Sequence, residues 1–136
     1  TCLGTYRYGG VIPWDGDVDI AVLLPDFENV RKTLNRLDPK KYHVQNWSGR
    51  SMPNSYFKIF IKQTASTIDI GFFSIDSQKH QVQCIFALEH SLFFPEWVKI
   101  RERRFSAPAP FSMVFPLKKA FFDGVQVFVP NQTKAY

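Results

Sequence analysis

The fold of this chain is decided by residues 9–24, GGVIPWDGDVDIAVLL, in which three aspartates at alternate positions lead into an unbroken apolar run. The apolar residues predict a buried strand over residues 18–24, closed by Pro25. Carboxylates that open a buried strand are costly to place there unless a positive group binds them. We therefore expect the chemistry of this protein at Asp15, Asp17 and Asp19.

Strand geometry predicts how these acids are arranged. Side chains two positions apart share a face, so Asp17 and Asp19 point together, roughly 6.5 Å apart at their Cα atoms. The apolar residues at the alternate positions then point into the core; they are Val18, Ile20 and Val22.

A second apolar segment, residues 67–75, carries the isolated acid Asp69 and predicts a second strand. If the two strands pair, Asp69 joins Asp17 and Asp19 on one face. Oxygen ligands of this kind favour Mg²⁺, Mn²⁺ or Ca²⁺ over zinc, and hold one ion or bridge two.

Two other interpretations of the aspartates fit less well. A calcium-binding loop counted from Asp15 needs glycine and glutamate where the chain has Ile20 and Asp26, which excludes it. A polar turn capped by acids explains Asp15 but not Asp19 within the strand.

Several residues near the acids are suited to binding phosphate. Gly9 and Gly10 let a backbone approach phosphate closely, and Arg7 offers a two-pronged donor, although an ordinary turn explains the glycines equally well. Lys58 falls on the polar face of a predicted strand over residues 56–62, where it is either a phosphate ligand or a solvated lysine.

The remaining pattern predicts a mixed α+β fold. Asp26 is placed to N-cap a helix that ends at Asp38 and Pro39, and a strand follows near residues 42–45. A polar loop runs through Ser55, residues 63–66 form a hairpin connection, and residues 106–110 are irregular. A final hairpin joins residues 120–122 to 125–129 through a turn at residues 123–124.

Composition sets the limits on function. The chain has 136 residues, a net charge of +5 and 45% hydrophobic residues, which suits a single domain. No stretch approaches the roughly 20 apolar residues of a membrane span. The basic run at residues 99–104 is a solvated helix face or loop, or a surface for an anion. Without a nucleic-acid-binding signature, we expect no DNA or RNA partner.

Cysteines and histidines carry no motif. Cys2 and Cys84 lack metal-type spacing, and buried free thiols are favoured over a single disulfide. The three histidines, His43, His80 and His90, pair with no acid or cysteine. Two glycosylation sequons, at Asn46 and Asn131, give a faint hint of the secretory pathway.

Read together, residues 3–20, LGTYRYGGVIPWDGDVDI, resemble the signature of the LicD family, which includes bacterial phosphocholine transferases and the animal proteins fukutin and fukutin-related protein. The segment IDIGFF at residues 68–73 resembles the family's second acid strand. The segments at residues 115–119, 121–124 and 127–130 resemble its closing part.

This resemblance implies a nucleotidyltransferase-like fold that moves a phosphorylated alcohol, such as phosphocholine or ribitol phosphate, from a CDP-linked donor to a hydroxyl of a glycan or glycoprotein. It assigns Asp17 and Asp19 to the pair that binds Mg²⁺ (or Mn²⁺) and Asp69 to the third metal-binding acid, with Asp15, which leads the cluster, as a further metal ligand. We expect three acids to be catalytic, namely Asp17, Asp19 and Asp69. The residues expected to bind substrate are Arg7, Gly9, Gly10 and Lys58. The resemblance also implies that residues 1–136 are one domain truncated at both ends, beginning inside a helix.

Two alternatives remain open at this point. One is a catalytically silent relative that serves as a binding or scaffold subunit in glycan assembly. The other is a nucleotidyltransferase that makes an activated sugar or modifies a small metabolite. We expect the Golgi lumen or secretory pathway, with the cytoplasm of bacterial members as the alternative, and any membrane anchor to lie outside this fragment.

Overall fold

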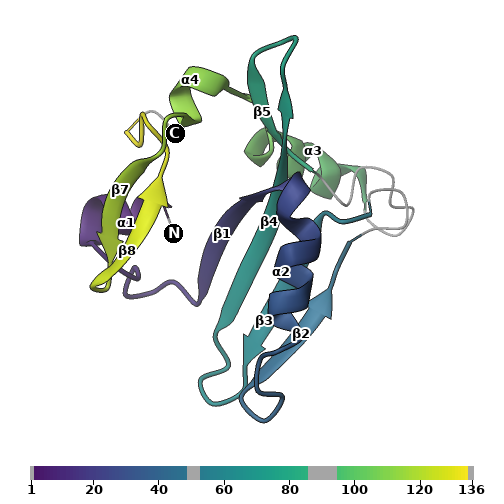
Figure 1. Cartoon of the computed structure of the whole chain (residues 1–136), viewed down its shortest axis with the longest axis vertical. Helices are drawn as coiled ribbons and strands as arrows, with labels where there is room; N and C mark the ends of the chain where they lie inside the picture. The colour runs from purple at the N-terminus through teal and green to yellow at the C-terminus, as the bar shows by residue number, and fades with distance from the viewer. Residues whose placement is uncertain (1, 49–52, 86–94, 135–136) are drawn as a thin grey trace.

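A computed structural model of the chain describes residues 2–48, 53–85 and 95–134 (Figure 1). The fold is α+β, as predicted. Its elements are, in chain order, α1 (Cys2–Tyr8), β1 (Asp17–Leu23), the 3₁₀ turn η1 (Leu24–Asp26), α2 (Phe27–Leu34), β2 (Tyr42–Asn46), β3 (Tyr56–Ile61), β4 (Thr67–Asp76), β5 (Gln81–Cys84), α3 (Glu96–Phe105), β6 (Ala109–Pro110), α4 (Phe111–Val114), β7 (Lys118–Phe122) and β8 (Val125–Val129).

A mixed sheet forms the centre of the molecule. Strands β2, β3, β4, β5 and β6 pair in that order and antiparallel, while β1 pairs with β4 in parallel. The hairpin of β7 and β8 is a separate two-stranded sheet that lies with α1 on the far side of β1 (Figure 1). Its turn residues Asp123 and Gly124 both have positive φ, 48° and 79°, as a tight hairpin turn requires.

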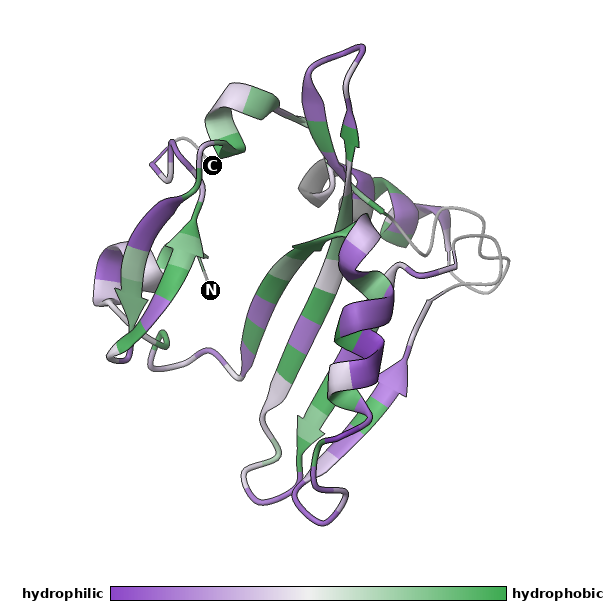
Figure 2. Cartoon of the chain, viewed as in Figure 1, coloured by the Kyte–Doolittle hydropathy of each residue, from purple (hydrophilic) through white to green (hydrophobic). Residues whose placement is uncertain are grey.

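One face of the central sheet is apolar and packs against α2. Phe27 of α2 stacks on Phe57 with 4.9 Å between ring centroids, and the neighbouring Phe72 is fully buried. Apolar and polar residues alternate along β1 and β4 (Figure 2). The apolar set therefore faces α2, and the polar set, which includes the acids, faces the other way.

Helix α2 differs from its prediction at both ends. Asp26 precedes the helix, but its side chain makes no capping hydrogen bond and instead accepts one from Asn29 at 3.4 Å. The helix ends at Leu34, four residues before Asp38, because tighter i→i−3 bonds replace α-helical bonding from Arg36 onwards. Leu37 still packs against the core, which explains its helical spacing in the sequence.

Strand β1 is less buried than its apolar run predicts. Val22 reaches the core, but Ile20 is 43% exposed. Among the described strands β1 pairs with β4 alone, so its other edge is not covered by sheet. Ile20 therefore lies beside Val30 and Leu34 of α2 on the predicted face, but it is not buried there.

Other expectations are confirmed with small changes. Strands β2, β3, β4 and the final hairpin lie where predicted, whereas residues 109–110 form a short strand on β5 instead of remaining irregular. The polar loop before Ser55 lies partly outside the described residues, at residues 49–52. In the described residues no helix is long and apolar enough to cross a membrane.

Candidate functional site

The strand pairing on which the three-acid hypothesis depends is present. Strands β1 and β4 run in parallel with Asp19 opposite Asp69 and Asp17 opposite Thr67. Neighbouring strands lie about 4.8 Å apart, and opposite residues share a face. The backbone thus brings Asp17, Asp19 and Asp69 to one patch on the polar face of the sheet.

Electrostatics show that the acids crowd one another. The pKa of Asp17 is raised, first by burial, then by the charge of Asp19 and by the charge and hydrogen bond of Asp15, with a smaller effect of Asp69. Like charges at close range disfavour ionisation of each group. A bound cation would relieve this repulsion.

Asp69 is the buried member of the cluster, with 8% of its surface exposed. Lys58 lies opposite it on β3 and donates a hydrogen bond to Oδ2 at 3.0 Å. The same Nζ lies 2.9 Å from Oδ1, close enough for an ion pair, but Oδ1 accepts no well-aligned hydrogen bond. Lys58 is thus on the polar face, as predicted, where it neutralises an acid of the site.

Tyr56 is a site residue that the sequence analysis missed. Burial raises the pKa of its hydroxyl, as do a hydrogen bond to Asp69 and the charges of Asp69, Asp19 and Asp17. The Tyr56 hydroxyl thus lies close to the Asp69 carboxylate. Tyr56 precedes Lys58 by two residues on the same strand, so the alternation that placed Lys58 on the polar face also places Tyr56 there.

The donor set fits a hard divalent cation in its chemistry, because it consists of carboxylate oxygens that repel one another. The side chains do not form a finished cage, however. Within the described residues, no three Asp, Glu, His or Cys side chains form a group that could hold a metal ion. The Lys58 ammonium group lies 2.9 Å from Oδ1 of Asp69, where it would compete with a metal cation for that carboxylate.

The predicted phosphate-binding residues lie around α1 and the loop that follows it. Arg7 is exposed in the last turn of α1, and Gly9 has a positive φ of 67°. Gly10 is buried, and a Cβ there would collide with the carboxylate of Asp123 from the β7–β8 turn. That carboxylate accepts a hydrogen bond from the backbone amide of Val11 at 3.1 Å. Close packing against the hairpin explains a glycine at position 10, and its role toward substrate stays a prediction.

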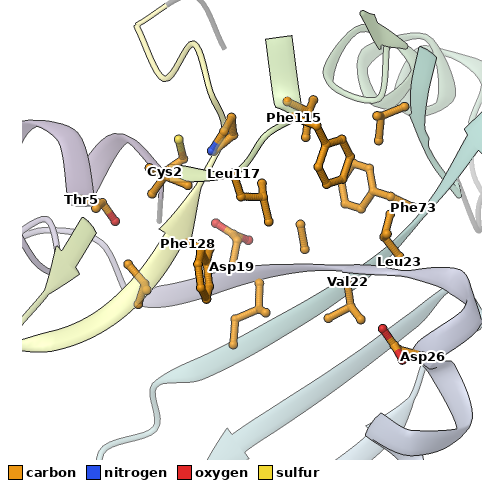
Figure 3. Close-up of a pocket in the computed structure, with 17 residues that line it drawn as sticks. Cys2, Thr5, Asp19, Val22, Leu23, Asp26, Phe73, Phe115, Leu117 and Phe128 are labelled. Atoms are coloured by element: carbon orange, nitrogen blue, oxygen red, sulfur yellow. The ribbon is translucent and has the colours of Figure 1, made fainter. Parts of the chain in front are cut away.

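A cavity of about 600 Å³ opens beside the acids (Figure 3). Asp19 points into it from β1, toward Leu117 and Phe128 of the C-terminal segment. The other walls come from α1, β4 and α4 and are mostly apolar, with Cys2 and Thr5 as polar members near the acid. The cavity therefore joins the central sheet to the C-terminal hairpin, with one acid of the site at its floor.

The remaining candidates lie away from the acids or outside the described residues. The basic run belongs to α3, where Lys99 and Arg103 form ion pairs with Glu96 at 3.6 and 3.0 Å. Cys2 and Cys84 are free, half-buried thiols. His90 lies outside the described residues.

The side-chain amide of the sequon residue Asn131 donates to the carbonyl of Ser112 at 3.0 Å, so it is engaged in holding α4. Asn46, in the other sequon, is exposed on β2 and accepts a hydrogen bond from the amide of Ser48.

Comparison with known families places nearly the whole chain in one of them. The model described as LicD/FKTN/FKRP, nucleotidyltransferase domain, matches residues 1–132, which is nearly the whole chain. A comparison with curated proteins gives no match.

Proposed function

The chain belongs to the LicD family, and from this premise we propose that it is a metal-dependent phosphotransferase acting on glycans. Membership of the family indicates transferase activity in glycan or cell-wall modification. The finer proposal is that a phosphorylated alcohol, of the phosphocholine or ribitol-phosphate type, moves from a CDP-linked donor to a glycan hydroxyl. We take the sheet and its flanking helices to be a nucleotidyltransferase-like fold.

The observation that carries this proposal is the register of β1 on β4, which sets Asp19 opposite Asp69 with Asp17 alongside. In the proposed site Asp17, Asp19 and Asp69 hold Mg²⁺ or Mn²⁺, and Asp15 flanks them. The bound metal would neutralise the diphosphate of the donor and stabilise the leaving nucleotide. Such a role requires Asp69 to share its carboxylate between the metal and Lys58.

The proposed transfer is a single displacement at phosphorus, for which this site supplies the proton acceptor. The acceptor oxygen forms a bond to the distal phosphorus of the donor while the bridging phosphorus–oxygen bond breaks and CMP leaves. Asp69 accepts the proton of the acceptor hydroxyl, and Tyr56 and Lys58 fix its orientation. Lys58 and the exposed Arg7 would balance phosphate charge.

The cavity beside Asp19 supports a place for the donor. Its apolar walls, which include the rings of Phe115 and Phe128, suit a flat base, and its acid-bearing floor suits the phosphates of a metal-bound nucleotide. A donor held there would present its diphosphate at the edge of β1, next to the acids.

The alternatives share most of the site. A silent scaffold subunit has no need of the full acid set, and this chain retains Asp15, Asp17, Asp19 and Asp69 together. A nucleotidyltransferase that makes an activated sugar would use the same acids with another acceptor. The Golgi lumen or secretory pathway stays our proposal for localisation, with the bacterial cytoplasm as the alternative.

Calorimetric titration of the protein with CDP, in Mg²⁺ and then in EDTA, tests the proposal. We expect binding that requires Mg²⁺, is lost in the Asp17→Asn/Asp19→Asn double variant and persists in Asp76→Asn, at the far end of β4. Turnover of CDP-choline and CDP-ribitol, followed as release of CMP, should vanish in Asp19→Asn. A folded protein that binds no CDP in either buffer would favour the silent scaffold, and near-normal turnover in Asp19→Asn would refute the metal site.

A further inference from the structure

The polar face of the sheet continues beyond Asp69 onto strands that the proposed chemistry does not use. Asp19, Asp69, Lys58 and Gln45 are successive neighbours across β1, β4, β3 and β2. Trp47, two residues beyond Gln45, lies on the same face and its backbone amide bonds the carbonyl of Tyr56. It is 52% exposed.

The orientation of this exposed indole is fixed by its neighbours. Its Nε1 donates to Oε1 of Gln45 at 2.6 Å, and the amide nitrogen of Gln45 lies 2.9 Å from Nε2 of His43. Lys58 Nζ lies over the indole, 5.5 Å from the ring centroid, and the ring of Tyr56 lies 6.4 Å away. A surface ring held in this way loses little further freedom when a ligand binds it.

The ring is linked to the acids through shared contacts. Lys58 contacts both Trp47 and Asp69, and Tyr56 contacts both as well. Strands β2 and β4 are two spacings apart, about 9.6 Å. In the row that starts at Trp47, Tyr56 on β3 comes first and Gly71 on β4 follows, where an added Cβ would meet only a Phe73 ring carbon at 3.7 Å. The face therefore carries no side chain at Gly71, and the Tyr56 ring lies between that position and Trp47.

The chemistry of the surface selects its ligand. A flat apolar ring face bordered by an amide and an imidazole suits a neutral sugar, whose C–H face covers the indole while its hydroxyls bond Gln45 and His43. Lys58 over the ring disfavours a cationic group such as choline, because it places a like charge there. An acceptor glycan that runs over Tyr56 and Gly71 would reach from Trp47 to Asp69.

We propose that Trp47, held by Gln45 and Lys58, is the stacking platform that binds a neutral sugar unit of the acceptor glycan. This inference rests on the proposed function for the identity of the ligand as acceptor, while the sugar site itself rests on the contacts of Trp47. Trp47 directly follows β2 and does not line the cavity beside Asp19, so acceptor and donor approach the acids from opposite sides.

Saturation-transfer NMR with methyl glycosides of galactose, N-acetylgalactosamine and glucose tests the platform directly. We expect at least one glycoside to bind the full protein, and Trp47→Ala to weaken that binding by about tenfold or more. Trp47→Phe keeps a flat ring and should retain part of the signal. The matched control is Trp97→Ala, which removes a 65% exposed tryptophan from α3 and should leave the signal unchanged.

Each outcome bears on the proposal. Unchanged glycoside signals in a Trp47→Ala variant, no glycoside binding at all, or displacement of the glycoside by CMP would each overturn the platform. A parallel CDP titration separates the two proposals. CDP binding that needs Mg²⁺ without glycoside binding leaves the transferase standing and removes the platform, whereas Trp47-dependent glycoside binding without CDP binding does the reverse. Thermal unfolding of each variant shows whether it is folded.

Discussion

At the scale of single residues, Lys58 contributes both to the stability of the fold and to the proposed site. It holds the buried carboxylate of Asp69, and both side chains are largely shielded from solvent. Removing one partner of a buried ion pair leaves the other charge uncompensated. The same lysine lies next to the proposed phosphate and sugar positions, so its role must be separated from its contribution to folding.

Lys58→Met should therefore lower the free energy of unfolding by about 3 kcal/mol. Adding Asp69→Asn should recover most of this loss, since the uncompensated charge is then gone. Urea denaturation measures both variants, with Lys79→Met as the control, because the Lys79 ion pair with Asp76 is exposed and 3.8 Å long. A double variant as unstable as Lys58→Met alone would show that the pair does not act through charge.

Ionisation of Asp17 should lower the stability of the fold as pH rises, whereas ionisation of an acid in an ordinary ion pair raises it. Its pKa is raised by burial and by Asp19 and Asp15, so the folded state binds its proton more tightly than the unfolded state does. Stability is then lost as pH rises from the ordinary carboxyl pKa, about 3.9, through the raised value, and the loss is complete at neutral pH.

Asp17→Asn should accordingly raise the Tm at pH 7 by about 2 °C in the absence of metal, and the gain should disappear near pH 3. The control is Asp76→Asn. Hydrogen bonds from the backbone amides of Lys79 and Gln78 lower the pKa of Asp76, so its replacement should bring no gain at pH 7. Calorimetric scans across this range check both, and a lower Tm for Asp17→Asn at pH 7 would contradict crowding among the acids.

At the scale of elements, the contact between the α1 loop and the C-terminal hairpin is fixed by a glycine. Gly10 leaves room for the carboxylate of Asp123, which bonds the Val11 amide, and the amide of Asp123 bonds the carbonyl of Gly9 at 2.8 Å. Gly4 of α1 is tight in the same place, since a Cβ there would lie 2.5 Å from the carbonyl oxygen of Gly10.

Gly10→Ala should destabilise the protein by about 2 kcal/mol, because Asp123 must leave its position and its hydrogen bond. Gly16→Ala is the matched control, as no atom outside its chain neighbours lies within 4 Å of the added Cβ and its φ is not positive. Chemical denaturation measures both. Equal stabilities of the two variants would show that the hairpin does not depend on this contact.

The sequence predicts those elements in which the pattern of apolar and polar residues shows which side chains are buried. The alternation around Lys58 and Asp69 predicts two strands and their polar face, and the turn at residues 123–124 predicts the last hairpin. The parallel pairing of β1 with β4 is a long-range contact that no local pattern predicts. The meeting of Asp69 with Asp17 and Asp19 was therefore predicted only on the condition that the two strands pair.

The elements that were missed lack such a signal. Strand β5 and helix α4 are short, and the pairing of Ala109 with Val82 follows from tertiary packing. Trp47 and Tyr56 share the parity of Gln45 and Lys58, so strand alternation could have placed them on the acid face. Their contacts with Lys58 and Asp69 required the structure.

At the scale of the whole molecule, the acids lie between two different surfaces. On one side the cavity is enclosed by α1, α4 and the β7–β8 hairpin, and on the other Trp47, directly after β2, is held against Gln45 of that strand. Backbone hydrogen bonds from Asn131 and Gln132 to the carbonyls of Val114 and Met113 hold the end of the hairpin to α4. A donor and an acceptor can thus be bound by separate walls and meet at the acids.

The cavity wall contains a thiol that reports on occupancy. Cys2 lines the cavity, and burial raises its pKa, so it should react slowly with a maleimide at pH 7 and faster as pH rises. In a Cys84→Ser background Cys2 is the single cysteine.

If the donor nucleotide occupies the cavity, CDP at ten times its Kd with Mg²⁺ should slow the modification about tenfold, because only the unoccupied fraction reacts. Mass spectrometry over time measures the rate. The Asp17→Asn/Asp19→Asn variant, which should not bind CDP, serves as the control and should show no protection. If CDP binds in calorimetry but leaves the Cys2 rate unchanged, the nucleotide lies elsewhere and the cavity must be assigned to another ligand.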